Sequence, residues 1–303
     1  MKSPIILIIC ILYLAGSYSV FGQESASSHH LKLEQYLTEN SEYLKTKEAM
    51  KRFRSSKLPA VGIATHRGAN EFAPENTLAA MQCALNLEVD YIEIDVRQTK
   101  DGQSVILHDG NLNRTTNGKG PLSNMNFEDV RSLSAGSWFN PFYVHEKIPT
   151  LEEACRLVSN HNKNDKQKTW FYVDCKDINA NILIANLSKY NLLDESVFYV
   201  SEQQIKQIRA LAPKAKMLPG LGSPKDIDRL IDNCHPYALD VNWKDVTKEL
   251  IEKAHAKGIK IFSDGFGDDQ NIESYMKAIK AGIDVVSTNK ISVICNAAER
   301  IQN

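Results

Sequence analysis

The sequence predicts an α/β fold of the (β/α)8 TIM-barrel class, with a small insertion after the second strand and a helix before the barrel. Short apolar runs alternate with helical stretches from residue 61 onward, and eight such runs remain after one antiparallel hairpin is set aside. Alternation of this kind is typical of parallel sheets built from βαβ units. A closed barrel of eight units places its reactive groups at the C-terminal ends of the strands.

The eight predicted strands are spaced so that a helix can lie between them. They span Val61–Thr65, Tyr91–Val96, Trp170–Val173, Val197–Val200, Lys216–Leu218, Tyr237–Val241, Ile259–Phe262 and Ile283–Ser287. A further run, Ser104–His108, is separated from the extended second strand only by Asp101 and Gly102. Two residues cannot form a parallel crossover, so this run predicts an antiparallel hairpin with a tight turn.

The composition excludes several classes of protein. The 303 residues are 43% hydrophobic and 24% charged, which is enough apolar material for a large core and is atypical of a disordered chain. Lysine and arginine number 36 against 37 acidic residues, for a net charge of -1. This balance lacks the basic surface that non-specific nucleic-acid binding requires, so we expect no nucleic-acid partner.

The first 22 residues have the pattern of an export signal. Lys2 precedes an apolar run, Ile5–Leu14, and the small residues of Ala15–Gly22 lead to a cleavage site at about residue 23. A membrane anchor is the alternative, but the run is shorter than the roughly 20 residues that span a bilayer. A lipid anchor is disfavoured because Ile9, and not a small residue, precedes Cys10. We therefore expect an exported protein, periplasmic or extracellular, without a membrane span after cleavage.

The rest of the chain is predicted to form two parts. Residues 23–58 comprise a polar linker and a helix, Leu31–Arg54, in which apolar residues recur at helical spacing. Residues 59–303 comprise the barrel, and the stretch of about 110–149, with a short helix at Phe127–Leu133, is the predicted insertion over its mouth. The cysteines that follow the signal are odd in number and widely spaced, which indicates buried thiols and no disulfide framework.

The first two predicted strands carry a dense group of polar residues. His66 and Arg67 follow the first strand, and Glu93 and Asp95 lie two positions apart in the second. The period of two along a strand points both carboxylates into the barrel if the intervening isoleucines face the outer helices. Two inward carboxylates repel each other unless a cation lies between them, and oxygen ligands favour Mg²⁺ or Ca²⁺ over zinc. A structural salt bridge to a barrel arginine or lysine is the alternative.

The hairpin and the third strand add three residues to this group. With Asp101 and Gly102 as the turn, Asp95 is expected opposite His108 to within one or two residues. Asp174 and Lys176 share one face of the third strand, where they offer a third metal carboxylate and a cation for phosphate. In isolation, an Asp-x-Lys pair is typical of a structural ion pair.

Together these side chains meet the chemical requirements of phosphodiester hydrolysis. A metal cation, an arginine and a lysine can balance the negative charge that develops on the phosphoryl group. Two histidines suit the two proton transfers, because the imidazole pKa of about 6.5 lies near working pH.

In the order and spacing of its motifs, the chain resembles the glycerophosphodiester phosphodiesterase family. The similarity extends from about Val61 to Asn289. Its motifs are His66-Arg67-Gly68, Pro74-Glu75-Asn76-Thr77-Leu78, Glu93-x-Asp95-Val96, Thr99-x-Asp101-Gly102, Val105-x-x-His108-Asp109 and Arg114-Thr115-Thr116, followed by Ile148-Pro149-Thr150-Leu151-Glu152-Glu153 and Asp174-x-Lys176.

The resemblance implies a barrel enzyme, a phosphoric diester hydrolase that converts glycerophosphodiesters to glycerol 3-phosphate and an alcohol. By this resemblance, His66 and His108 act as acid and base. A divalent metal, Mg²⁺ or Ca²⁺, is expected at Glu93, Asp95 and Asp174. The family usually has glutamate at the third of these positions, so Asp174 is a departure.

The resemblance also suggests the residues that hold the substrate. Arg67 and Lys176 are expected to contact phosphate, with Asn76 and Phe262 as further substrate-binding candidates. Late in the barrel the family usually places a tryptophan against the glycerol of the substrate, whereas this chain has Phe262-Ser263-Asp264. The identity of the alcohol is left open by this second departure.

Two other functions stay open at this point. The first is phospholipase-like cleavage of lipid or inositol phosphodiesters through a cyclic phosphate. Exposed aromatic residues at the mouth would favour it, and the insertion contains the candidates Trp138, Phe139, Phe142 and Tyr143, which could equally form the core of the insertion. The second is a non-catalytic phosphodiester-binding protein, to which only Asp174 points. The sequence indicates no oligomeric state.

Overall fold

A computed structural model describes residues 31–56, 61–265 and 270–302. The predicted export signal, residues 1–22, lies outside the described residues, as does the start of the predicted linker. The chain divides into two compact units, residues 1–45 and 46–303, and the boundary falls within helix α2 (Ser41–Arg54). In the part that the structure describes, no helix has both the length and the apolar character needed to cross a membrane.

The predicted helix Leu31–Arg54 is interrupted. Residues 31–38 form one helical segment and α2 begins at Ser41. Between them, Oδ1 of Asn40 accepts hydrogen bonds from the backbone nitrogens of Glu42 and Tyr43, at 3.0 and 3.1 Å. An asparagine in this position caps a new helix and satisfies N–H groups that have no partner within it. The prediction of one continuous helix was therefore wrong.

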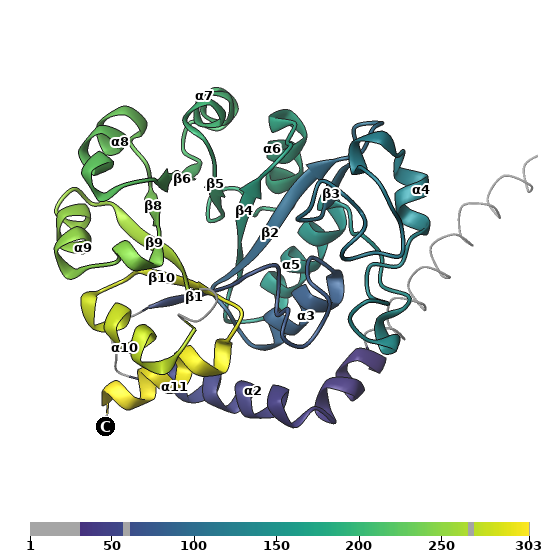
Figure 1. The fold of residues 1–303 in the computed structure, drawn as a ribbon, viewed down its shortest axis with the longest axis horizontal. Coiled ribbons are helices and arrows are strands. Elements are labelled where there is room, and N and C mark those ends of the chain that lie inside the picture. The colour runs from purple at the N-terminus through teal and green to yellow at the C-terminus, as the bar shows by residue number, and fades with distance from the viewer. Residues whose placement is uncertain (1–30, 57–60, 266–269, 303) are drawn as a thin grey trace, which may run out of the picture. The chain divides into compact units, whose positions relative to one another are not determined.

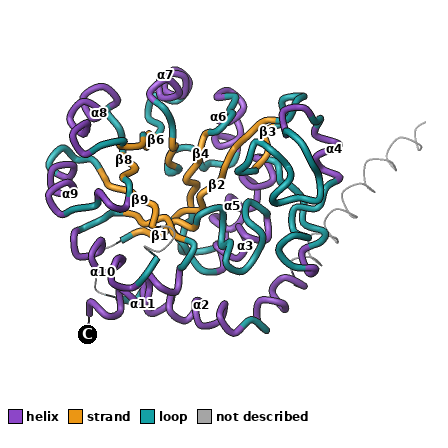
Figure 2. The backbone as a smooth tube through the Cα atoms, viewed as in Figure 1, coloured by secondary structure: helices purple, strands orange, loops and turns teal. Residues whose placement is uncertain are grey.

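In the second unit, parallel strands form a ring with helices outside it (Figures 1 and 2). All eight predicted strands are present, and a short ninth strand, β7, was not predicted; the sheet order is β6-β5-β4-β2-β1-β10-β9-β8-β7. The strands are β1 (Gly62–Thr65), β2 (Tyr91–Gln98), β4 (Trp170–Cys175), β5 (Val197–Tyr199), β6 (Lys216–Leu218), β7 (Gly220–Leu221), β8 (Ala238–Val241), β9 (Lys260–Gly265) and β10 (Val285–Thr288).

The ring closes through the junction of β6 and β7. Pro219 separates these two strands because proline has no N–H group to continue a ladder. Its carbonyl still accepts a hydrogen bond of 3.1 Å from the backbone nitrogen of Asp240, and the carbonyl of Met217 accepts one of 2.9 Å from Tyr237. The two short strands therefore act as one interrupted barrel strand, and the predicted barrel class is confirmed.

Two of the outer helices, α5 and α7, begin at capping boxes. Thr150 and Ser201 each form a capping box with the third residue of the following helix. The helices are α3 (Leu78–Asn86), α5 (Leu151–Asn164), α6 (Ala180–Lys189), α7 (Glu202–Leu211), α8 (Ile227–Cys234), α9 (Lys248–His255), α10 (Ile272–Ala281) and α11 (Ile291–Gln302). The five cysteines in the described part are buried free thiols, as predicted.

The predicted hairpin forms, but with a different turn. Its strands are β2 and β3 (Ser104–Ile106), and the loop contains three residues, since Thr99 and not Lys100 lies opposite Gln103. Gly102 has φ +84°, the left-handed conformation typical of three-residue hairpin loops. The two-residue turn was wrong, and the register shifts by one residue. His108 then lies one position beyond the residue opposite Asp95, within the predicted range.

The insertion has a hydrophobic core of its own, which includes α4 (Phe127–Ser132). Its aromatic residues pack around Tyr143, which is 1% exposed and donates a hydrogen bond of 2.8 Å to the carbonyl of Phe72. The rings of Phe139 and Phe142 lie 5.7 and 4.9 Å from that of Tyr143, and Trp138, which is 41% exposed, packs on Phe139. The four aromatic residues therefore pack on one another, separately from that core, and Tyr143 anchors the insertion to the first βα loop.

Candidate active site

Inward side chains form layers in the barrel, and the layer at the C-terminal end is polar. An apolar layer consists of Ala64, Tyr172, Val197, Leu218, Ala238, Phe262 and Val285, with Tyr91 packed against it. Because side chains alternate along a strand, the residue two positions further on faces the interior again, nearer the mouth. These residues are His66, Asp174, Tyr199, Gly220, Asp240, Asp264 and Ser287, with Glu93 on β2.

Three carboxylates converge at this mouth. One oxygen each of Glu93, Asp95 and Asp174 lies within 4.8 Å of the others. Burial raises the pKa of Glu93 well above its ordinary range, and the charge of Asp95 adds to the rise. Burial also raises the pKa of Asp174, although Lys176 opposes the effect. Oxygen ligands at this separation fit a hard divalent cation, and the shorter side chain of Asp174 still reaches the group.

A strained loop is fixed to these carboxylates. Arg67 and Asn76 have φ values of 59° and 56°, which are uncommon for residues other than glycine and cost about 1 kcal/mol or more each. The backbone nitrogen of Arg67 donates to Oε2 of Glu93 at 2.7 Å. The side-chain amide of Asn76 donates to Oδ2 of Asp95, also at 2.7 Å. Asn76 is 3% exposed, and its side chain helps to position this carboxylate. Its contact with substrate stays a prediction.

Two basic side chains lie beside the carboxylates. Nε of Arg67 is 3.4 Å from Oδ2 of Asp95, and Nζ of Lys176 is 3.4 Å from Oδ1 of the same carboxylate. Lys176 also forms an ion pair with Asp174. The salt bridges considered from the sequence are thus present, but two cations cannot neutralise three carboxylates. Burial and then the charges of Asp95 and Asp174 raise the pKa of Glu93.

The two histidines have different partners. Nδ1 of His66 lies 2.9 Å from the amide oxygen of Asn289, whereas Nδ1 of His108 lies 2.7 Å from a carboxylate oxygen of Asp109. Each acceptor favours a proton on Nδ1, which puts the lone pair of the neutral ring on Nε2. Burial lowers the pKa of His66 to about 4, and the charge of Arg67 adds to the effect. The site therefore combines a neutral imidazole with one that is paired to a carboxylate.

A family model described as the glycerophosphoryl diester phosphodiesterase family matches residues 66–293, which contain all the groups above. The chain belongs to this family. It is 29% identical over 248 residues to the glycerophosphodiester phosphodiesterase of Caldanaerobacter subterraneus subsp. tengcongensis, and the match covers 78% of this chain and 98% of the relative. The predicted family and its enzyme class, phosphoric diester hydrolase, are confirmed.

Solved structures agree with this membership. The glycerophosphodiester phosphodiesterase of Agrobacterium tumefaciens str. C58 has a TM-score of 0.70 at 26% identity, over 78% of this chain and 99% of that one. A phosphodiesterase of Oleispira antarctica, solved in complex with the product sn-glycerol-3-phosphate, also has a TM-score of 0.70, at 24% identity over 80% of this chain and 97% of that one. At 24% identity, the similarity to the Oleispira antarctica structure supports only the shared fold.

In this member of the glycerophosphoryl diester phosphodiesterase family, an ionic network joins Arg67 to His108. Nη1 of Arg67 donates to Glu75 at 2.8 Å, and Arg114 makes two bonds to the same carboxylate, at 2.7 and 2.8 Å. Arg114 also donates to Asp109 at 2.8 Å, and Asp109 contacts His108. The hydrogen bond from Arg114 lowers the pKa of Asp109. Burial alone would raise the pKa of Glu75, but its ion pairs with the two arginines lower it.

The sequence contained these network residues without revealing their contacts. Glu75, Asp109 and Arg114 belong to the motifs that suggested the family, but Arg114 and Glu75 are 39 positions apart, and no periodicity relates them. The short spacing of Asp109 to Arg114, and of His108 to Asp109, was the available signal. It does not distinguish a local network from solvated charges.

The structure does not bring Phe262 to the mouth. Phe262 is 1% exposed and lies in the apolar layer, with its ring 5.6 Å from Tyr91 and 6.1 Å from Tyr172. Asp264, two positions further along β9, occupies the polar layer instead. Burial raises the pKa of Asp264 to about 6. The sequence had also given no reason to select Asp240, whose pKa is raised by burial and by the charge of Asp264.

Proposed function

We propose that this enzyme hydrolyses glycerophosphodiesters to glycerol 3-phosphate and an alcohol, with a divalent cation, Mg²⁺ or Ca²⁺, and with two histidines in the proton transfers. One observation carries the proposal: three carboxylates, an arginine, a lysine and two imidazoles meet at the C-terminal mouth of one barrel. This is where barrel enzymes carry their chemistry. The predicted roles of His66, His108, Arg67 and Lys176 are retained in it.

Glu93, Asp95 and Asp174 would hold the cation. The fit is supported by the 4.8 Å limit on the separation of their oxygens and by the rise that burial causes in the pKa of Glu93, which a divalent charge would reverse. A cation in this place would supply Lewis-acid stabilisation of charge on the phosphoryl oxygens. Arg67 and Lys176 would contact the same phosphoryl group from either side.

The partners of the two histidines support different roles. His66 is paired to a neutral amide, and burial lowers its pKa to about 4, so at pH 7 it can accept a proton from the water molecule that attacks phosphorus. His108 is paired to Asp109, and a carboxylate can share the charge of an imidazolium where an amide cannot. His108 is therefore the better donor to the departing alcohol oxygen. Thus His66 is proposed as the base and His108 as the acid.

Two leaving groups separate these roles. With Mg²⁺ or Ca²⁺, His66→Ala and His108→Ala should each lower kcat/KM for glycerophosphocholine by about 10³-fold. On the 4-nitrophenyl ester of glycerol 3-phosphate, whose leaving group departs without a proton, His108→Ala should regain activity to within about tenfold of the unsubstituted enzyme. His66→Ala should stay inactive on both esters.

His145→Ala is the matched control, because His145 is exposed on the insertion and lies outside the ionic network. Its kcat/KM should be unchanged on both esters. Full turnover of glycerophosphocholine by both active-site variants would disprove the mechanism. Rescue of His66→Ala and not His108→Ala by the nitrophenyl ester would reverse the two assignments.

A further inference from the structure

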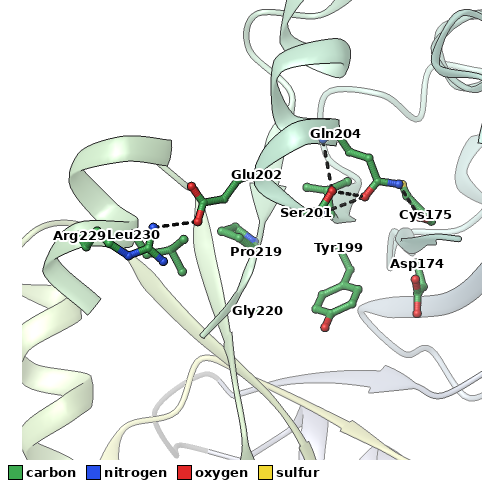
Figure 3. Close-up of a pocket in the computed structure, with 11 residues that line it drawn as sticks. Asp174, Cys175, Tyr199, Ser201, Glu202, Gln204, Pro219, Gly220, Arg229 and Leu230 are labelled. Atoms are coloured by element: carbon green, nitrogen blue, oxygen red, sulfur yellow. Dashed lines mark hydrogen bonds and ion pairs between the residues drawn. The ribbon is translucent and has the colours of Figure 1, made fainter. Parts of the chain in front are cut away.

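A cavity lies beside the proposed catalytic residues, next to β8 and β9. It has a volume of about 530 Å³, and its lining includes Tyr199, Gly220, Asp240, Trp243 and Asp264. Tyr199 and Gly220 also line the neighbouring hollow of about 360 Å³ that contains Asp174. Figure 3 shows the carboxylate of Asp174 and the hydroxyl of Tyr199 directed to the same side of this hollow. One arm of a phosphodiester held at the mouth can therefore extend into the cavity.

The cavity contains two carboxyl groups that no basic side chain pairs with among the described residues. No lysine, arginine or histidine in the described ranges forms an ion pair with Asp240 or Asp264, whereas Asp95 and Asp174 have such partners. Oδ1 of Asp240 is buried and, among the residues described, has no hydrogen-bond partner. Neither carboxylate belongs to the group of oxygens that lie within 4.8 Å of one another. A metal ion held by that group would leave this second pair uncompensated.

One wall of the cavity is aromatic and rigid. The indole ring of Trp243 packs edge to face on Tyr275, with ring centres 5.5 Å apart. Tyr275 is fully buried, and its hydroxyl lies 2.6 Å from Oγ1 of Thr288. Gly265 allows this packing, because a Cβ atom there would lie 2.8 Å from the ring of Tyr275 and 3.4 Å from that of Trp243. Tryptophan is the side chain that binds organic cations best through its ring face.

We propose that this cavity binds the ammonium group of the substrate alcohol, so that the enzyme prefers glycerophosphodiesters of amino alcohols such as choline to those of uncharged alcohols. This inference rests on the proposed function and specifies its substrate. An ammonium group beside Asp240 and Asp264 balances charge that is costly to bury alone, and the ring of Trp243 adds a cation–π contact. An uncharged alcohol would leave both carboxylates uncompensated.

The charge of the alcohol can be tested at constant shape. Glycerophosphocholine and its 3,3-dimethylbutyl isostere differ only in that a carbon atom replaces the quaternary nitrogen. We expect kcat/KM to be about 10- to 50-fold higher for the choline ester. The ratio is measured on a single enzyme preparation, so any unfolded fraction cancels.

Removal of the carboxylates should abolish this preference. Asp240→Asn and Asp264→Asn should each lower the choline-to-isostere ratio about fivefold, and the double variant should bring the ratio close to one. Asp245→Asn is the matched control. Asp245 lies in the segment after β8, two residues beyond Trp243, but it does not line the cavity. Its substitution also removes one negative charge, so the choline-to-isostere ratio should not change.

Three results would overturn the inference. The first is a ratio near one in the unsubstituted enzyme. The second is an equal loss on both esters in the Asp240 and Asp264 variants, which would mean that the cavity binds the shared glycerol arm. The third comes from calorimetry on His66→Ala with Ca²⁺, which is expected to bind the choline ester more than tenfold tighter than the isostere. Equal affinities of His66→Ala for the two esters would refute the assignment of the cavity. If His66→Ala binds the choline ester selectively but the unsubstituted enzyme does not hydrolyse it, only the proposed function is refuted.

Discussion

The two ends of the barrel differ in how their carboxylates are balanced. At the N-terminal end, Asp90 accepts hydrogen bonds of 3.0 and 2.9 Å from two nitrogens of Arg54, and Asp284 lies 2.7 Å from Nε2 of His255. Each of these aspartates also accepts a backbone N–H at 2.8 Å. Both remain 22 to 24% exposed, so the charges at this end are paired and partly hydrated.

At the C-terminal mouth, carboxylates outnumber their basic partners. Burial raises the pKa of Glu93, Asp174, Asp240 and Asp264. Stability alone does not explain such an arrangement, because each buried charge without a partner opposes folding. The difference distinguishes the charges that stabilise the barrel from those that we propose bind a metal and a substrate.

The largest expected effect comes from Glu93→Gln. The substitution removes a charge but keeps an oxygen that can accept the bond from the backbone of Arg67. We expect kcat/KM to fall about 10³-fold because the cation site is lost. The Tm of the metal-free protein should not fall, and a rise of a few degrees is expected as like charges are separated. Steady-state kinetics and calorimetry measure the two quantities.

The matched change at the other end is Asp90→Asn, for which the opposite pattern is expected. Arg54 loses its carboxylate, while an amide oxygen remains for the backbone nitrogen of Ile63. The expected loss of unfolding free energy is about 2 kcal/mol, with kcat/KM unchanged within about threefold. If the two variants lost activity and stability in the same proportion, the contrast between the two ends would have no functional meaning.

A smaller loss of activity is expected from a change in the ionic network of the mouth, where Arg114 pairs with Glu75 and Asp109. Arg114→Lys keeps the charge but cannot bridge Glu75 and Asp109 in the same way. We expect kcat/KM to fall about 10- to 100-fold, as for other residues that orient catalytic groups. The acid limb of the pH profile should move to higher pH, because the hydrogen bond from Arg114 is the main cause of the lowered pKa of Asp109.

Arg131→Lys is the control for this change. Arg131 makes a similar two-bond pair with Glu153, at 2.9 and 2.6 Å, away from the histidines. Its pH profile should match that of the unsubstituted enzyme. An Arg114 variant with a parallel loss of activity at every pH would indicate that the network has only a structural role.

Part of the mouth could be predicted from the sequence, whereas neither ion pair of the N-terminal end was predicted. Alternation along the second strand correctly placed Glu93 and Asp95 inside the barrel, since one face of that strand is a continuous apolar surface under the helices. The hairpin brought His108 near them despite an error of one residue in the turn. These features depend on local geometry over a few residues, which sequence periodicity describes well.

The depth of a side chain along the barrel axis could not be predicted in the same way. Phe262 and Asp264 share a face of β9, but only Asp264 lies at the mouth. Depth depends on the stagger between neighbouring strands, which links β9 to β8 and β10 through contacts distant in sequence. The pairing of Glu75 with Arg114 also depends on a contact distant in sequence, so the sequence did not predict it. Nor did the sequence predict that Asp240 has no basic partner among the described residues.

The smallest effect concerns metal-linked stability, and it compares the two ends through pH. Since burial raises the pKa of Glu93 and Asp174 in the folded protein, these groups favour folding most at low pH. Their contribution is lost as the pH rises through the folded pKa values. A divalent cation should restore it at high pH, where protons no longer compete for the carboxylates. Saturating Ca²⁺ or Mg²⁺ should therefore raise the Tm by about 5 °C at pH 8 and by less than half as much at pH 5.

Asp90→Asn should show the same metal-induced shift as the unsubstituted enzyme, because the N-terminal end has no part in cation binding. Glu93→Gln should show little or none. An equal shift at both pH values would mean that the cation binds elsewhere, at carboxylates whose pKa values lie below both. A shift retained in Glu93→Gln but lost in Asp90→Asn would place the site at the wrong end of the barrel, and the excess charge at the mouth would then need another explanation.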